Sequence, residues 1–150
     1  MTTSADLAPA PLLHTNPHKF LAVGWLGHGS VYKTGPTARH IFEKISQFAT
    51  HPAPFPLPVA GGKHQCELCQ FEAPSFNGEI FVPYKGHIYA APIGITHYIA
   101  THYYQPPQIF LDAVAQCPDR QTMAYKKLLL VNGGRELLIT LREVELRLSR

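Results

Sequence analysis

Two cysteines and two histidines stand in pairs whose types and spacing suit a metal ion. Two residues separate Cys66 from Cys69, and four separate His97 from His102. Structural zinc sites use four tetrahedral thiolate and imidazole ligands, and both spacings are typical of such sites. The sequence therefore predicts a zinc site formed by Cys66, Cys69, His97 and His102.

The local sequence around each pair favours convergence on one ion. Gly61 and Gly62 precede the cysteines and make a tight turn easier to enter. Histidines five apart at a helix end converge if the last turn loosens, and Pro106 downstream favours that. The 27 residues between the two pairs leave room for a β-hairpin. His64 and His87 are the substitutes if one of the four ligands is wrong.

Two other interpretations of the cysteine pair stay open. A redox pair is one, although no clean βαβ pattern surrounds Cys66 and Cys69 as a thioredoxin-like protein requires. Two buried thiols are the other, because free cysteine packs as a small hydrophobe. Cys117 follows an apolar helical stripe and precedes Pro118, so we expect it in the core.

Four protein ligands close the coordination sphere of zinc, so the leading hypothesis is a structural site in an interaction or regulatory module. If His97 or His102 is not a ligand, the site opens to water, and the chain becomes a candidate zinc-dependent hydrolase or nuclease. Glu67, Glu72 and Glu79 are then the candidate bases. Neither the zinc deaminase signature nor His-Glu-x-x-His occurs in the sequence.

Length and composition indicate one folded domain. The chain has 150 residues, of which 45% are hydrophobic and 15% charged. This length can bury a core, and this composition excludes disorder for most of the chain. No run approaches the roughly 20 apolar residues of a membrane span. Three cysteines without a secretory signal predict a reducing, cytoplasmic location.

Another protein is the expected partner, and nucleic acid is the third functional class. A net charge of +3 is too small to indicate nucleic-acid binding by itself. The residues that would serve that function are Lys126, Lys127, Arg142 and Arg147, with Tyr103 and Tyr104 exposed for stacking.

Hydrophobic periodicity and turn residues predict the elements that position these side chains. We expect a mobile N-terminal arm over 1–18, a single domain over 19–150, and a Pro-rich connector over 51–60 within it. Expected strands are 20–26 paired with 30–33, and 79–84 paired with 87–91. Expected helices are 36–50, 92–102, 108–116 and 121–131. The tail 135–150 fits a helical stripe better than the alternation of a strand.

The predicted fold class is α+β, a single domain of small antiparallel hairpins with a zinc-knuckle centre and a helical C-terminal half. The centre is treble-clef-like or an enlarged ββα unit. Expected core residues are Trp25, Ile41, Phe42, Ile45, Phe81, Ile88, Ile99, Phe110, Val114, Leu128 and Leu129.

Over residues 20 to 120 the chain resembles a set of small uncharacterised bacterial proteins. The shared pattern is Cys-x2-Cys followed by His-Tyr-Ile-x2-His-x-Tyr-x-Pro-Pro-x2-Phe, with Gly78-Glu-Ile-Phe-Val-Pro83 between the two parts. The resemblance implies a metal site at the two cysteines and two histidines, and it implies no activity. Those proteins have His-Gly-Tyr where this chain has His102-Tyr103-Tyr104, so the bend after the second histidine is expected to differ.

Overall fold

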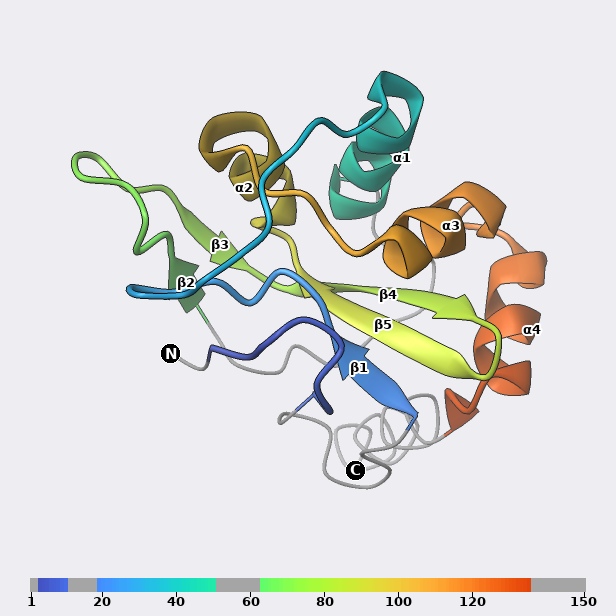
Figure 1. The fold of residues 1–150 in the computed structure, drawn as a ribbon. Coiled ribbons are helices and arrows are strands. Elements are labelled where there is room, and N and C mark those ends of the chain that lie inside the picture. Colours follow the sequence, from blue (N-terminus) through green and yellow to red (C-terminus); the bar gives the residue numbers. More distant parts are fainter. Residues whose placement is uncertain (1–2, 11–18, 51–62, 136–150) are drawn as a thin grey trace, which may run out of the picture.

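The computed structural model describes residues 3–10, 19–50 and 63–135. Within them the chain is a mixed α+β fold, with a three-stranded sheet, a two-stranded sheet and four helices (Figure 1). The expected fold class is therefore confirmed. The expected connector over 51–60 and nearly all of the tail over 135–150 lie outside the described residues.

A β-hairpin forms two of the three strands of the larger sheet, whose order is β1-β5-β4. Strands β4 (Glu79–Tyr84) and β5 (His87–Pro92) pair antiparallel, as predicted. Lys85 and Gly86 connect them with φ angles of +47° and +85°. A two-residue loop with positive φ at both positions matches the right-handed twist of the strands. Both faces of this hairpin are covered, because β4 is buried from Glu79 to Pro83 and β5 from Ile88 to Pro92.

Strand β1 (Phe20–Ala22) pairs parallel with β5, and this corrects the predicted hairpin between 20–26 and 30–33. The strand ends early because Gly24 has φ +78°, a conformation that breaks the extended backbone. Residues 23–26 continue as a buried irregular segment, in which Trp25 Nε1 donates to the carbonyl of Ala90 at 2.9 Å. The sequence pattern predicted the buried apolar run over 20–26, but it did not predict that β5 is the strand that pairs with it.

The N-terminal segment lies along β1 over residues 4–10, within the range 1–18 for which we expected a mobile arm. The Ala10 amide donates to the carbonyl of Phe20 at 2.9 Å, and the Ala22 amide donates to Ala8 at 2.8 Å. The Ala10 side chain is buried. Backbone pairing orders this segment although its sequence shows no periodicity; residues 11–18 lie outside the described part.

Four helices cover the sheet: α1 (Arg39–Thr50), α2 (Ile95–His102), α3 (Gln108–Gln116) and α4 (Met123–Val131). The prediction for α3 is confirmed, and the other three begin two to three residues later than expected. Helix α2 starts after β5 because Pro92 still belongs to the strand. Helix α4 starts after Thr122, whose hydroxyl accepts a hydrogen bond from the Tyr125 amide.

The core lies between the larger sheet and helices α1, α2, α3 and α4 (Figure 1). Eight predicted core residues are buried: Trp25, Ile41, Ile45, Phe81, Ile88, Phe110, Val114 and Leu129. Phe42, Ile99 and Leu128 are only half-buried. Cys117 is 3% exposed, as expected for a core thiol. The prediction missed four fully buried tyrosines, Tyr89, Tyr98, Tyr104 and Tyr125.

In the described part of the chain, no helix has the length and the apolar surface that a membrane crossing requires.

Candidate metal centre

The cysteine pair lies in the loop of the smaller hairpin. Strands β2 (Lys63–Gln65) and β3 (Ser75–Asn77) pair antiparallel, and the loop between them carries Cys66 and Cys69. The Cys66 amide donates to the carbonyl of Pro74 at 3.0 Å, which extends the pairing into the loop. The hairpin therefore presents both sulfur atoms from one rigid base beside α2 (Figure 1).

Helix α2 supplies both histidines, and its C-terminus turns sharply after the second one. Tyr103 follows His102 with φ +54°, in the left-handed conformation. The Tyr103 and Tyr104 amides both donate to the carbonyl of Tyr98, which closes the last turn. The predicted loosening at the helix end therefore takes the form of a left-handed residue, and His97 and His102 converge with ring centroids 5.0 Å apart.

The four predicted ligands meet at one point. Cys69 Sγ lies 3.2 Å from His97 Nε2 and 3.3 Å from His102 Nε2, and Cys66 Sγ lies 3.4 Å from His102 Nε2. All four ligand atoms lie within 4.8 Å of one another. Tetrahedral zinc bonds imply a sulfur-to-nitrogen separation of about 3.5 Å. This group can hold a metal ion.

The substitute ligands are not part of this group. His64 points to the far side of Tyr98, where its Nε2 lies 2.6 Å from the Tyr98 hydroxyl. His87 begins β5 and contacts Tyr89 instead.

Neighbouring groups orient the His97 ring. His97 Nδ1 lies 3.3 Å from the Thr101 hydroxyl, one helical turn along α2. When the Thr101 hydroxyl accepts a hydrogen bond from Nδ1–H, the Nε2 lone pair of His97 faces the sulfur atoms, as a metal ligand requires. The Phe76 ring packs 5.7 Å from the His97 ring. Gly94 makes room for Phe76, because a Cβ at Gly94 would lie 2.6 Å from the phenyl ring.

The centre has a buried side and an accessible side. Cys66 is 2% exposed, whereas Cys69, His97 and His102 are half-buried. Tyr98 is fully buried beneath the histidines. An ion could therefore enter from the solvent side, where Cys69, His97 and His102 are half-buried. The opposite side, with Cys66 and Tyr98, is closed to water.

The electrostatics of the four groups favour a cation. Burial, followed by the hydrogen bond and charge of Cys66, raises the pKa of Cys69. Burial and the neighbouring His102 lower the pKa of His97, so its imidazole stays neutral. The raised pKa of Cys69 is unlike that of the low-pKa thiolate of a redox nucleophile. A bound divalent cation would instead stabilise both thiolates.

Of the residues proposed for the alternative functions, Arg142 and Arg147 lie outside the described part of the chain, and the three glutamates are not part of the metal group. Glu67 and Glu72 are exposed on the hairpin loop, and Glu79 is buried in β4; none belongs to the metal group. Tyr104 is fully buried, so the expectation that it is exposed for stacking is wrong. Its hydroxyl donates to Asp6 at 2.7 Å, a partner that its position in the sequence could not reveal.

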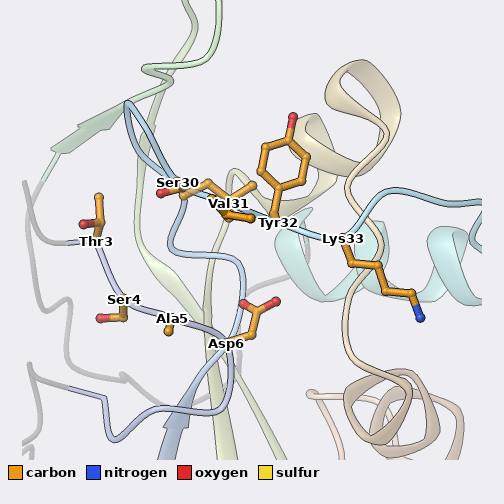
Figure 2. Close-up of a pocket in the computed structure, with 9 residues that line it drawn as sticks. Thr3, Ser4, Ala5, Asp6, Ser30, Val31, Tyr32 and Lys33 are labelled. Atoms are coloured by element: carbon orange, nitrogen blue, oxygen red, sulfur yellow. The ribbon is translucent and has the colours of Figure 1, made fainter.

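A cavity of about 320 Å³ lies between the N-terminal segment and the segment that follows β1. It is lined by residues 3–6 on one side and residues 30–33 on the other (Figure 2). Asp6 faces this space, but its carboxylate already accepts from the Gly24 amide and the Tyr104 hydroxyl. Tyr32, also in the lining, donates to the carbonyl of His102 at 3.3 Å. The polar groups of this cavity thus hold the N-terminal segment and the end of α2 in place.

Comparison with known proteins identifies a family. The model of a family described as "Domain of unknown function (DUF7919)" matches residues 2–115. This range contains all four ligands and ends within α3. No curated protein and no solved structure matches the chain.

Proposed function

The chain belongs to the DUF7919 family, and because the description of that family assigns no activity, we propose a function from the metal group itself. The protein is a zinc-binding protein whose Cys66, Cys69, His97 and His102 form a structural site. The observation that carries the proposal is the convergence of two sulfur and two Nε2 atoms within 4.8 Å.

Zinc is the metal that suits this ligand set. Two thiolates and two imidazoles are among the commonest structural zinc ligands. Hard cations such as Mg²⁺ and Ca²⁺ prefer oxygen ligands, and the group contains none. A thiolate site also requires reduced cysteines, which fits the expected cytoplasmic location.

Four protein ligands favour a structural role over catalysis. A catalytic zinc keeps one position for water or substrate. Both histidine Nε2 atoms lie within 3.4 Å of a cysteine sulfur, which supports their use as ligands and leaves no such position. Glu67 and Glu72 are exposed and lie outside the group of four, which supports a structural site over a hydrolase or nuclease that uses one of them as its base.

The metal would fix two surface segments that present apolar side chains to solvent. Phe71, two residues after Cys69, is 83% exposed, and Tyr103, directly after His102, is 56% exposed. Exposed aromatic side chains on a rigid loop are typical anchors for a protein partner. Lys126 and Lys127 lie on α4, away from α2 and the smaller hairpin (Figure 1), so these two lysines do not accompany the exposed aromatics; Arg142 and Arg147 lie outside the described residues. We therefore favour a protein partner over nucleic acid.

Elemental analysis of the purified protein tests the zinc proposal. We expect one zinc per chain, and removal by a chelator should lower Tm because metal binding contributes to folding free energy. Protein purified without chelator that carries no zinc would contradict the proposal.

The partner is tested with a matched pair of surface variants. Phe71→Ser should abolish partner binding with an unchanged Tm. Met123→Ser, which alters a 67% exposed residue on α4, should leave partner binding intact. Equal binding by both variants and the wild type would contradict a docking role for the hairpin loop.

We also propose that the four ligands recur together across the family, as in the bacterial proteins that the sequence resembles. An alignment of family members in which the cysteines and histidines vary independently would contradict this.

A further inference from the structure

A buried hydrogen bond joins the two segments that carry the ligands. The Tyr98 hydroxyl and His64 Nε2 share a hydrogen bond of 2.6 Å. Tyr98 is fully buried and His64 is 4% exposed. A histidine and a tyrosine hidden from water both need such a partner, because an unpaired buried polar group destabilises the fold. The pair thus ties β2 to α2 without using any of the four ligands.

Each member of the pair stands next to the ligands of its own segment. His64 lies on β2, two residues before Cys66. Tyr98 directly follows His97 on α2, and its ring centroid lies 6.0 Å from that of His97 and 6.4 Å from that of His102. A displacement of the Tyr98 ring would therefore displace both imidazoles, and a displacement of His64 would move the cysteine loop.

The pair is also anchored to the core of the fold. The Trp25 ring meets the His64 ring edge-on, with centroids 6.3 Å apart and planes at 84°. Trp25 is in turn hydrogen-bonded to Ala90 in the central strand β5. A continuous series of contacts therefore runs from β5 through Trp25, His64 and Tyr98 to the two histidine ligands.

We infer that His64 and Tyr98 are positioning residues that assemble the two ligand pairs before the metal binds. This inference rests on the proposed zinc site. Bringing together two ligand pairs that lie 27 residues apart costs conformational entropy. When the fold orders both pairs in advance, that cost no longer weakens metal binding. The His64–Tyr98 pair acts on affinity through orientation, since neither side chain belongs to the metal group.

Cobalt(II) is the probe, because its absorption spectrum in the visible reports tetrahedral thiolate coordination. The titration compares the wild type with Tyr98→Phe, His64→Leu and the double variant. Tyr125→Phe is the matched control, because its hydroxyl is also buried and also donates a hydrogen bond, to the Phe81 carbonyl at 2.5 Å, while Tyr125 lies on α4. Metal-free Tm is measured for every variant.

We expect Tyr98→Phe and His64→Leu each to weaken cobalt binding about 10-fold, the lower end of the range for residues that orient metal ligands. The double variant should bind no more weakly than the worse single variant, because the two residues act as one pair. Tyr125→Phe should lower Tm and leave the cobalt Kd unchanged. Tyr98→Phe is the mildest of these changes, since it keeps the ring and removes one oxygen atom.

The outcomes separate this inference from the proposal on which it rests. Wild-type affinity and spectrum in both single variants, with only Tm lowered, would overturn the positioning role and leave the zinc site standing. The same loss of affinity in Tyr125→Phe would also overturn it, because any loss of stability would then explain the effect. A wild-type protein that shows no tetrahedral thiolate spectrum would overturn the zinc site and the inference together.

Discussion

The His97 and His102 rings face each other with centroids 5.0 Å apart, at an angle of 79° between their planes. Residues five apart on a regular α-helix point about 140° away from each other. His102 is the last residue of α2, and Tyr103 after it adopts φ +54°, so the chain leaves the helical path directly after the second histidine. The group of Cys66, Cys69, His97 and His102 therefore includes a helix terminus.

Tyr103→Gly should stabilise the protein. The left-handed conformation strains a residue that has a Cβ, and glycine adopts it freely. Tyr103 is 56% exposed, so its removal sacrifices few contacts. We expect a gain of about 0.5–1 kcal/mol in the free energy of unfolding, measured by denaturant titration. Ala100→Gly, at an exposed α2 residue with ordinary helical geometry, is the control and should lose stability.

The sequence predicted which cysteines and histidines come together because residue type and spacing are local signals, and it missed contacts that depend on distant pairing. Cys66, Cys69, His97 and His102 could be chosen from residue type and spacing alone. The β4–β5 hairpin was equally accessible, since Lys85-Gly86 is a strong turn signal. The parallel pairing of β1 with β5 has no comparable local signature, because its partner lies 68 residues away in the register Phe20↔Ile88.

The buried tyrosines explain the remaining errors. Tyrosine is amphipathic, so a sequence pattern cannot tell a stacking surface from a core position. The buried Tyr104 hydroxyl donates a hydrogen bond to Asp6, and the buried Tyr98 hydroxyl shares a hydrogen bond with His64 Nε2. The buried role of both tyrosines is fixed by partners from parts of the chain for which the sequence predicted other roles.

Substitution of any one of the four proposed ligands should remove the metal. Substitution of a cysteine or a histidine outside the group should not. Cys66→Ser and His102→Ala each delete one of four ligands, so both should lower zinc content below one per chain and lower Tm. Cys117→Ser and His87→Ala are the controls, because neither residue belongs to the metal group. Zinc content is measured by elemental analysis after gel filtration. Full zinc retention by His102→Ala would reveal a different or open ligand set.

Acid should destabilise the centre. Burial and His102 hold the pKa of His97 below its usual value near 6.5, so the unfolded chain binds a proton more readily than the folded one. The contribution of neutral His97 to the free energy of unfolding is therefore fully present above about pH 6.5, and it is lost as the pH falls through the lowered pKa of the folded state. Protons also compete with the metal for both thiolates and both imidazoles. Zinc content and Tm measured from pH 8 to pH 4 should fall together; a protein that keeps its zinc at about pH 4 would contradict the ligand set.

Asp6→Ala should destabilise the protein by about 1–3 kcal/mol. The substitution leaves the buried Tyr104 hydroxyl without its acceptor and also removes the acceptor of the Gly24 amide. The free energy of unfolding from denaturant titration provides the measurement. Leu7→Ala in the same N-terminal segment, where the side chain is 40% exposed, should change it by less than about 0.5 kcal/mol. Wild-type stability in Asp6→Ala would mean that the segment is not ordered against β1 in solution.

The elements after residue 115, where the family match ends, should be required for stability. Leu129 in α4 is fully buried, and Asn132 accepts a hydrogen bond from Gly86 in the β4–β5 turn. Leu129→Ala should therefore cost about 2–5 kcal/mol, whereas Leu130→Ala, at 42% exposure, should cost far less. Thermal unfolding of the two variants checks this. Equal Tm values would show that α4 is not part of the cooperative unit.

X-ray absorption spectroscopy of the zinc-loaded protein tests the central claim most directly, because it counts the ligand atoms around the ion. A closed Cys2His2 site predicts two sulfur atoms at about 2.3 Å and two imidazole nitrogen atoms at about 2.0–2.1 Å. That result would identify a structural centre made by Cys66, Cys69, His97 and His102. A shell with fewer than two sulfur atoms, or with a water oxygen in place of one imidazole, would contradict it.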